Sequence, residues 1–357
     1  MLDRNELDNM LETMVRSGAS TLHIVSDRAP SLRIRDKLVR SEGGSVSGQD
    51  VASLLKFVVP EGQQARVDRG EELDALYTTD SGVRFLGTAS LDERGPAISF
   101  RRVADQPPTF QDLGLPELLD SFCSFRSGLV LVTGFFGSGK STTLASMAAR
   151  ILQSRSAHVV GIESPIEYVL DHGQGVVHQR EVGRHVASFA AGVREAVRHG
   201  ADVIVVGAVQ DLATVEALLD AVERGALVLA GLQAPSIVGS LERIDSIAAG
   251  TDLDRLHGRL AQALRVVFSQ TLLPRSHGDG TVPLLENAIS NRNIAKAIRA
   301  GRYEGMPELM ERGRGLGMQT TDLGLKALLS HNAISIEDAL HHAVDRDWVY
   351  QWGRSRG

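Results

Sequence analysis

Four short, almost uniformly apolar runs constrain the fold of this chain most. They are GLVLVTG (128–134), AHVVGIE (157–163), ADVIVVG (201–207) and ALVLAGL (226–232). Helical patterns separate these runs, and strands with apolar residues on both faces are typical of parallel sheets that helices cover on both sides. We therefore predict an α/β fold with a RecA-like, doubly wound sheet at its centre.

A phosphate-binding motif follows the first of these runs. The segment GFFGSGKST (134–142) matches G-x-x-x-x-G-K-[ST] and stands between a strand-like and a helical run. In such a loop, backbone amides and the helix N-terminus face the phosphates, the lysine reaches the outer phosphates and the next hydroxyl ligates magnesium. We expect a nucleoside triphosphate with Mg²⁺, and Ser141 as the metal ligand. The predicted nucleotide-binding residues are Gly134, Gly137, Ser138, Gly139, Lys140, Ser141 and Thr142.

A different pattern occupies the first hundred residues. Residues 3–16 carry apolar side chains at helical spacing. Strand-like runs follow at 21–26, 31–39, 83–91 and 97–103, with a helical segment between the second and the third. Strands mixed with helices, without a phosphate loop among them, predict a small α+β domain over residues 1–104.

A double proline, Pro107–Pro108, marks the domain boundary. The residue before a proline is restricted to extended backbone, which is typical of a linker. We predict a linker over residues 105–116 and a nucleotide-binding domain over 117–357. From about residue 250 that domain is expected to be mostly helical, with the amphipathic segments 253–272 and 320–344.

The composition is that of an ordinary soluble globular chain. Of its 357 residues, 43% are hydrophobic and 23% charged, and the net charge is -6. This charge argues against nucleic acid or an anionic membrane as a direct partner, and an aromatic content of 4% argues against stacking on single strands. A single cysteine, Cys123, fits a reducing compartment, and we interpret it as a buried thiol. The charged N-terminal stretch lacks the apolar centre of a signal peptide, so we expect a cytoplasmic protein.

Further motifs carry a family resemblance. They are IESPIEYV (162–169), QREVG (179–183), GRGLGMQTTDLGL (313–325) and GASTLHIVSDRAPSLRI (18–34). Together with the phosphate-binding loop, they make nearly the whole chain resemble the secretion-type ATPases, and most closely the type IV pilus retraction ATPases of the PilT/PilU family. The segment QREVG is specific to this group and argues against an unrelated P-loop kinase.

The resemblance implies a PAS-like N-terminal domain, a RecA-like ATPase domain and a hexameric ring that binds ATP. It also implies a role in twitching motility at the cytoplasmic face of the inner membrane. The expected partner there is the inner-membrane pilus platform protein, and membrane association would run only through partners.

In this family, arginines of the N-terminal domain contact the nucleotide of a neighbouring subunit, where a delocalised cation suits phosphate oxygens. The matching region, VRFLGTASLDERGPAISFRR (83–102), contains Arg84, Arg94, Arg101 and Arg102. Leu86 replaces the second arginine of the family's RFRVN, so the match is partial. A solvated surface charge is the other interpretation of each arginine.

The positions that normally carry catalytic charge in this family are altered. The acidic box keeps its glutamates as Glu163 and Glu167, but Ser164 stands where the family has an aspartate. Three more neutral residues stand at charged or titratable positions of the family. Ala208 replaces a glutamate, Gln210 an arginine and Gln233 a histidine. The phosphate-binding loop is therefore complete, whereas the residues expected to face the γ-phosphate are neutral.

Few acids remain that could activate water, which hydrolysis requires. Asp202 lies at the far end of the strand that precedes Ala208, about 20 Å away, and Asp211 has the position of a helix N-cap. Glu163 is the remaining candidate catalytic base, because it ends a neighbouring strand at the edge where open α/β sheets bind ligands. A solvated or salt-bridged acid is its other interpretation. Losing one catalytic group costs on the order of 10²- to 10⁴-fold in rate, so we expect ATP binding with hydrolysis reduced or lost.

Two functions from different classes remain open. The first is a PilT-like motor, an enzyme of the ATPase family that couples ATP hydrolysis to movement at the pilus base. The second is a non-hydrolysing, nucleotide-binding regulatory or assembly subunit that partners an active pilus or secretion ATPase. The expected assembly is a homo-hexamer or a mixed ring with an active paralogue.

Overall fold

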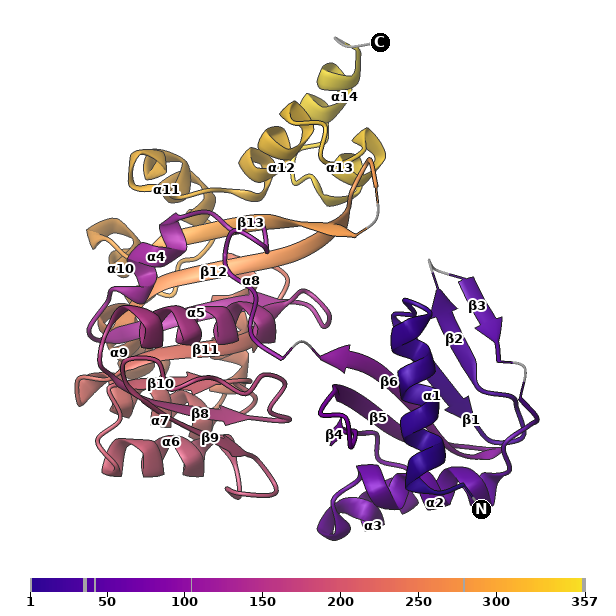
Figure 1. The fold of residues 1–357 in the computed structure, drawn as a ribbon. Coiled ribbons are helices and arrows are strands. Elements are labelled where there is room, and N and C mark those ends of the chain that lie inside the picture. Colours follow the sequence, from indigo (N-terminus) through magenta and orange to yellow (C-terminus); the bar gives the residue numbers. More distant parts are fainter. Residues whose placement is uncertain (1, 35–36, 42, 104, 279, 355–357) are drawn as a thin grey trace. The chain divides into compact units, whose positions relative to one another are not determined.

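The computed structural model of the chain describes residues 2–34, 37–41, 43–103, 105–278 and 280–354 (Figure 1). The chain separates into two compact units. The first combines Met1–Gln106 with Ser164–Val169, and the second combines Pro107–Glu163 with Leu170–Gly357. The short segment Ser164–Val169 therefore belongs to the first unit, although in sequence it lies between two strands of the second.

The first unit is built on a six-stranded antiparallel sheet with the strand order β3-β2-β1-β6-β5-β4. Its strands are β1 Thr21–Val25, β2 Ser31–Ile34, β3 Lys37–Arg40, β4 Leu73–Thr78, β5 Arg84–Asp92 and β6 Gly95–Val103. Its helices are α1 Arg4–Arg16, α2 Gly48–Val58 and α3 Gln64–Asp68, with a 3₁₀ turn, η1, over Glu61–Gln63. Apolar residues of α1 and α2 form the core of this unit with strand residues such as Ile24 and Phe100.

The strands predicted for this unit are present, with two differences. The run 31–39 forms two antiparallel strands, β2 and β3, where the sequence pattern suggested one. Strand β4 was not predicted, although Leu73, Ala75 and Tyr77 alternate along it as buried residues. The polar residues between and after them obscured this alternation in the sequence.

The second unit contains a seven-stranded sheet with the order β13-β12-β7-β11-β10-β8-β9. Its strands are β7 Gly128–Gly134, β8 His158–Glu163, β9 Val176–Glu181, β10 Val203–Val206, β11 Leu227–Gln233, β12 Leu264–Pro274 and β13 Thr281–Ile289. All neighbouring strands are parallel except β12 and β13, which form an antiparallel pair. The prediction of an α/β fold with a central parallel sheet is therefore confirmed.

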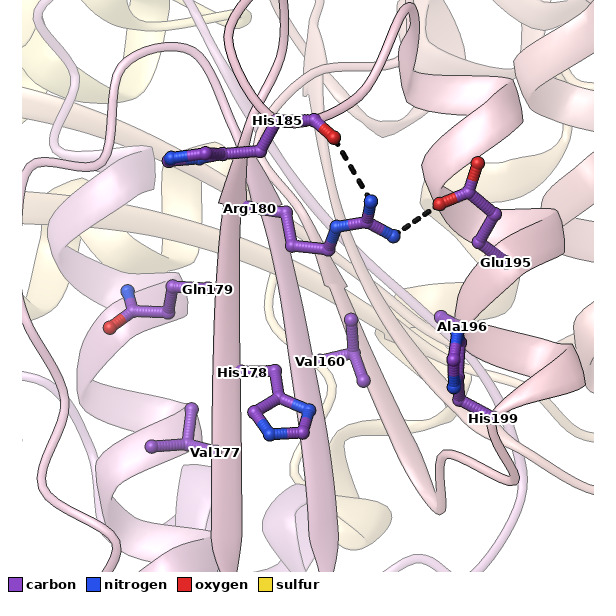
Figure 2. A pocket seen from close by; sticks show the side chains of 9 residues that line it. All are labelled: Val160, Val177, His178, Gln179, Arg180, His185, Glu195, Ala196 and His199. Carbon is purple, nitrogen blue, oxygen red and sulfur yellow. Dashed lines mark hydrogen bonds and ion pairs between the residues drawn. The ribbon is translucent and has the colours of Figure 1, made fainter.

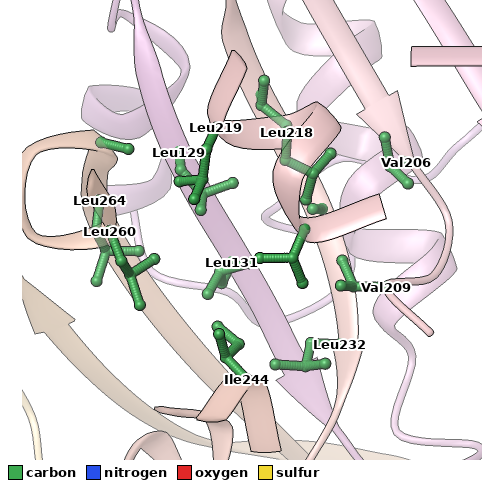
Figure 3. Packing of buried hydrophobic residues seen from close by; sticks show 14 of the residues in the cluster. Leu129, Leu131, Val206, Val209, Leu218, Leu219, Leu232, Ile244, Leu260 and Leu264 are labelled. Carbon is green, nitrogen blue, oxygen red and sulfur yellow. The ribbon is translucent and has the colours of Figure 1, made fainter. Parts of the chain in front are cut away.

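Helices cover both faces of this sheet. The helices of the second unit are α4 Leu118–Cys123, α5 Lys140–Ser154, α6 Phe189–Arg198, α7 Leu212–Glu223, α8 Ile237–Ile247, α9 Leu253–Ala263, α10 Arg292–Arg299, α11 Met306–Arg312, α12 Thr321–Ser330, α13 Ile336–His342 and α14 Asp347–Arg354, with a 3₁₀ turn, η2, over Arg314–Leu316. On one face, Leu129 and Leu131 of β7 pack in a buried cluster with residues of α7, α8 and α9 (Figure 3). On the other face, Gly231 of β11 lies against Leu144 of α5. Alternating residues along each strand thus serve two helix layers, which explains why the strands read as continuous apolar runs.

The expected helix over 253–272 is wrong in its second half. Helix α9 ends at Ala263, and the chain continues directly as strand β12. The residues after Leu264 include Val266, Val267 and Phe268, whose branched and aromatic side chains favour a strand. These residues pair with β7 on one side and β13 on the other. The region after residue 250 therefore contributes two strands to the sheet. In sequence, α9 precedes these strands and the remaining helices follow them.

Two smaller predictions are confirmed. Segment 320–344 forms α12 and α13. Cys123 is buried, and burial raises the pKa of its thiol to about 12. In the part of the chain that the structure describes, no helix has both the length and the apolar character required to span a bilayer.

Candidate nucleotide-binding site

The glycine-rich loop joins the end of β7 to the start of α5. Three of its glycines have backbone φ angles that other residues rarely adopt: +148° at Gly134, +76° at Gly137 and +86° at Gly139. Glycine adopts such angles without strain. The chain can therefore turn sharply between the strand and the helix, and the first residue of the helix is Lys140.

Lys140 folds back over this loop. Its Nζ donates hydrogen bonds to the main-chain oxygens of Gly134, at 3.0 Å, and Phe135, at 2.7 Å. Burial of the ammonium lowers the pKa of Lys140 below its ordinary value. A cation held by two neutral carbonyls would gain from an anionic acceptor, since an opposite charge adds Coulomb attraction to the hydrogen bond.

The hydroxyl residues of the loop differ in exposure. Ser138 is buried, and its Oγ has no hydrogen-bond partner among the described residues. Ser141 is exposed in the first turn of α5, and Thr142 is partly exposed beside it. An exposed hydroxyl in this turn fits a magnesium ligand, and the glycines with positive φ fit a phosphate cradle. The residues present are thus compatible with Mg²⁺ and a triphosphate.

The altered catalytic positions lie along the same edge of the sheet as this loop, because β7, β8, β10 and β11 run parallel. Gln233 ends β11 and pairs directly with Gly134. Ala208 and Gln210 follow β10, which lies one strand further away, and Glu163 ends β8, beyond β10. At about 4.8 Å between strands, β10 is roughly 10 Å and β8 roughly 14 Å from β7.

Glu163 is held by a residue of the QREVG segment. Gln179 of β9 donates its Nε2 proton to Glu163 Oε1 at 2.9 Å, and its Oε1 accepts a hydrogen bond from the Leu170 backbone N–H at 2.8 Å. The amide therefore fixes the orientation of this carboxylate. The sequence marked Gln179 as part of a group-specific motif, but nothing in its spacing indicated a contact with Glu163, 16 residues earlier.

The other two acids lie at the positions that the sequence suggested. Asp202 precedes β10, at the edge opposite the loop, and accepts a hydrogen bond from the His158 backbone N–H at 2.8 Å. Asp211 caps α7 by accepting from the Thr214 backbone N–H at 2.7 Å. Both carboxylates are thus engaged in local structure.

The candidate arginines of the first unit do not form one group. Arg84 of β5 and Arg101 of β6 lie on the same face of adjacent strands, since Leu86 pairs with Arg101. Arg94 lies in the β5–β6 turn, at the end of β5 opposite Arg84, and the length of that strand separates the two by about 27 Å. Arg102 pairs with Phe85 and so lies on the opposite face from Arg101.

Arg84 and Arg101 both contact the segment Ser164–Val169. An Arg84 guanidinium nitrogen lies 3.4 Å from the Ile166 main-chain oxygen, and Arg101 forms an ion pair with Glu167 at 2.8 Å. The second glutamate of the acidic box is thus paired with a candidate nucleotide-binding arginine of the same chain. The sequence alone did not suggest this pairing.

A separate cavity of about 660 Å³ lies between β9 and α6 (Figure 2). Arg180 extends between Glu195, with which it forms an ion pair, and the His185 main-chain oxygen, which it contacts at 2.9 Å. His178 and His199 also line the cavity. Among the described residues, no three or more His, Cys, Asp or Glu side chains are grouped so that they could hold a metal ion. The arginine of QREVG thus has a structural ion pair, whereas the glutamine of the same segment supports Glu163.

Comparison with known proteins identifies the class. Residues 4–311 match the family described as Type II/IV secretion system protein, so the chain belongs to that family. Within it, the chain falls among the type IV pilus retraction ATPases, which confirms the resemblance seen in the sequence.

Three similar proteins illustrate this placement. The chain is 31% identical to the type IV pilus retraction ATPase PilT of Pseudomonas aeruginosa, over 95% of this chain and 98% of that protein. It is 32% identical to the uncharacterised protein YggR of Escherichia coli K12, over 88% of this chain and 95% of that one. The crystal structure of the pilus retraction motor PilT with bound ADP matches with a TM-score of 0.84 and 31% identity, over 97% of this chain and 99% of that chain.

Proposed function

We propose that this protein binds ATP and Mg²⁺ as a PilT/PilU-type member of the secretion ATPase family, and that its ATP hydrolysis is reduced or lost. One contrast carries the proposal. The glycine-rich loop and Lys140 are complete, whereas Ala208, Gln210 and Gln233 are neutral along the same edge of the sheet.

The loop residues define how the nucleotide would be held. Backbone amides of Gly137 and Gly139, together with the N-terminus of α5, would face the phosphates. Lys140 would exchange its two carbonyl partners for phosphate oxygens, and Ser141 and Thr142 would complete the cradle, with Ser141 on the metal. Bound Mg²⁺ supplies charge neutralisation of the phosphate oxygens. PilT itself has been crystallised with ADP, which supports a nucleotide at this loop.

Reduced hydrolysis follows from what remains around the loop. Glu163 is the only acid proposed as a base, and its strand is separated from β7 by β11 and β10. A lateral separation of about 14 Å is long for direct action on a water beside the γ-phosphate. Gln233, which is next to Gly134, offers an amide where the family has a titratable histidine. The residues that would bind ATP are therefore present, whereas most of the charged residues that the chemical step requires are absent.

The proposed biological setting is a type IV pilus or related secretion machine, because PilT and PilU are named for that role. We propose a ring of six copies or a mixed ring with an active paralogue, docked on an inner-membrane platform protein at the cytoplasmic face. In such a ring the PAS-like N-terminal domain would offer Arg84 and Arg101 to a neighbouring nucleotide. Arg101 would then exchange Glu167 for phosphate.

A regulatory or assembly subunit is the second candidate function. The neutral residues Ala208, Gln210 and Gln233 favour it, because they remove turnover without disturbing the loop that senses the nucleotide. In this role the protein would respond to ATP by changing its assembly or its partner's activity, with hydrolysis left to the partner.

Two measurements on the purified full chain test the proposal. Binding of a fluorescent ATP analogue in the presence of Mg²⁺ should be detectable for the wild type and lost in Lys140→Ala. Steady-state phosphate release should be far below that of PilT assayed under the same conditions. A wild type that hydrolyses ATP as fast as PilT, with that activity lost in Lys140→Ala, would refute reduced hydrolysis, and a wild type without ATP binding would refute the proposal as a whole.

A further inference from the structure

We infer that Gln270 is a positioning residue of the nucleotide site, which holds both ends of the glycine-rich loop in place through contacts from behind it. The inference rests on the proposed binding of ATP at this loop. Gln270 belongs to β12, the strand that the sequence pattern had assigned to a helix.

The strand pairing places Gln270 beside the loop. Strand β12 lies next to β7, on the side opposite β11. Ser269 pairs with Thr133, so Gln270 follows the last paired residue and lies opposite Gly134, where the loop begins. Gln270 is buried, with 4% of its surface exposed, so its polar atoms face the protein interior.

The side chain of Gln270 reaches the other end of the loop. Thr143, in the first turn of α5, is fully buried and donates its Oγ1 proton to Gln270 Oε1 at 2.9 Å. The Thr143 backbone N–H also donates to Gly139 O at 3.0 Å, so this residue is joined both to β12 and to the last glycine of the loop.

The space around two glycines supports the same role. A Cβ atom at Gly139 would lie 2.8 Å from Gln270 Nε2, and a Cβ atom at Gly134 would lie 2.4 Å from the Gln270 main-chain oxygen. Gln270 therefore touches the first and the last glycine of the loop, one through its backbone and one through its amide. These glycines are required by β12 behind the loop as well as by their φ angles.

A buried hydrogen bond that only stabilises the fold is the alternative. The two roles differ in what they change. A purely structural bond would lower the thermal midpoint of unfolding and leave the affinity of the folded protein for ATP unchanged. A bond that holds the loop would change that affinity at temperatures where the protein is fully folded, because a looser cradle must be ordered when ATP binds.

Position 143 offers a matched pair of variants. Thr143→Val keeps the shape of the side chain and removes the hydroxyl, whereas Thr143→Ser keeps the hydroxyl and removes a methyl group. We expect the Kd for the fluorescent ATP analogue with Mg²⁺ to rise roughly three- to tenfold in Thr143→Val, as for the loss of one neutral hydrogen bond. Thr143→Ser should bind like the wild type. Thr214→Val is the control, because Thr214 Oγ1 is also buried and has no hydrogen-bond partner among the described residues.

Gln270→Met completes the test, since it removes the amide at nearly constant volume. Its Kd should rise at least as much as that of Thr143→Val, and the double variant should bind no more weakly than Gln270→Met, because contacting residues act on one interaction. Thermal unfolding establishes that each variant is folded at the assay temperature. If Gln270→Met does not fold, the pair at position 143 still decides the outcome.

The possible results separate the inference from the proposed function. If the wild type binds no more tightly than Lys140→Ala, ATP binding itself fails. If the wild type binds but Thr143→Val and Gln270→Met bind equally well, the positioning role is refuted. Weaker binding by Thr143→Ser than by Thr143→Val would also refute it, because packing of the methyl group would then be the relevant contact.

Discussion

A glutamate at position 208 is expected to raise the rate of ATP hydrolysis. Neighbouring strands hold the backbone on both sides of Ala208: Gly207 donates its N–H to Ile162 O at 2.9 Å, and Val209 donates to Gly231 O at 2.8 Å. A longer side chain at a fixed, partly exposed position changes mainly the chemical group that it presents. Only β11 separates β10 from β7, so the new carboxylate would start about 10 Å from the loop strand, closer than the roughly 14 Å of β8.

The size of the gain follows from what one catalytic group contributes. A positioned general base is worth about 10²- to 10⁴-fold in rate. We expect the lower end of that range, about a hundredfold, because Gln210 and Gln233 stay neutral and catalytic groups do not act independently. A hundredfold corresponds to about 2.7 kcal/mol of activation free energy.

Phosphate release at saturating ATP and Mg²⁺ measures this effect. Ala208→Gln is the matched control, since it has the same length and hydrogen-bonding amide but no carboxylate, and it should remain at the wild-type rate. Lys140→Ala combined with Ala208→Glu gives the background. The reasoning is refuted if the Glu and Gln variants hydrolyse ATP at the same rate, or if the wild type already matches Ala208→Glu.

Three further predictions concern the residue that holds Glu163, a buried carboxyl group and the hydrophobic core. In the wild type, where Glu163 is the candidate base for residual turnover, Gln179→Leu should lower that turnover about tenfold, because the carboxylate of Glu163 loses a donor, with ATP affinity unchanged in the binding assay; unchanged residual turnover would exclude a role for Glu163. Glu286 of β13 accepts a hydrogen bond from the Ile237 backbone N–H at 3.0 Å. Burial raises the pKa of Glu286, so its neutral form is favoured in the folded protein and its contribution to stability falls as the pH rises through the folded-state pKa. Glu286→Gln should therefore unfold in urea at a higher midpoint than the wild type at neutral pH, and the difference should close as the pH falls below the ordinary value of 4.5. Leu131→Ala, in the centre of the buried cluster, should lower the free energy of unfolding by about 2–5 kcal/mol in the same assay, and a loss below about 1 kcal/mol would contradict the packing described.

The parallel sheet was predictable because its strands are buried on both faces. Leu129 and Leu131 serve one helix layer while the residues between them serve the other, so the run appears apolar without a period. Strand β12 has the same surroundings, yet it follows α9 without a break, and the helical pattern continued through it. No glycine or proline separates the two elements, so the branched side chains of Val266 and Val267 are a weak signal in the sequence, and their pairing with β7 shows where the helix ends.

The part of the site that one continuous motif forms was predictable from the sequence. The contacts between segments that are far apart in the sequence were not. The loop from Gly134 to Thr142 is one continuous motif, and the positions of its glycines in the sequence predict where the backbone adopts positive φ angles. The contacts that support it join residues far apart: Thr143 to Gln270, 127 positions later, and Glu163 to Gln179, 16 positions later. No spacing rule for catalysis includes Gln270 or Gln179, so a single sequence does not indicate these contacts. The register between neighbouring strands, which only the structure shows, brings the partners together.

ATP binding without hydrolysis would restrict the functions that this protein can have. A ligand stabilises the state that binds it better by an amount set by its concentration and its differential affinity for the two states. Without turnover, the occupancy of the loop around Lys140 would follow the ATP concentration. The protein would leave its ATP-bound state only when ATP dissociates, so ATP could not drive repeated conformational cycles. A protein of this kind would act as a sensor or as a structural member of a ring whose other subunits hydrolyse ATP. The consequence can be measured: the assembly state should follow the ATP concentration reversibly, should be the same with a non-hydrolysable analogue, and should be insensitive to ATP in Lys140→Ala.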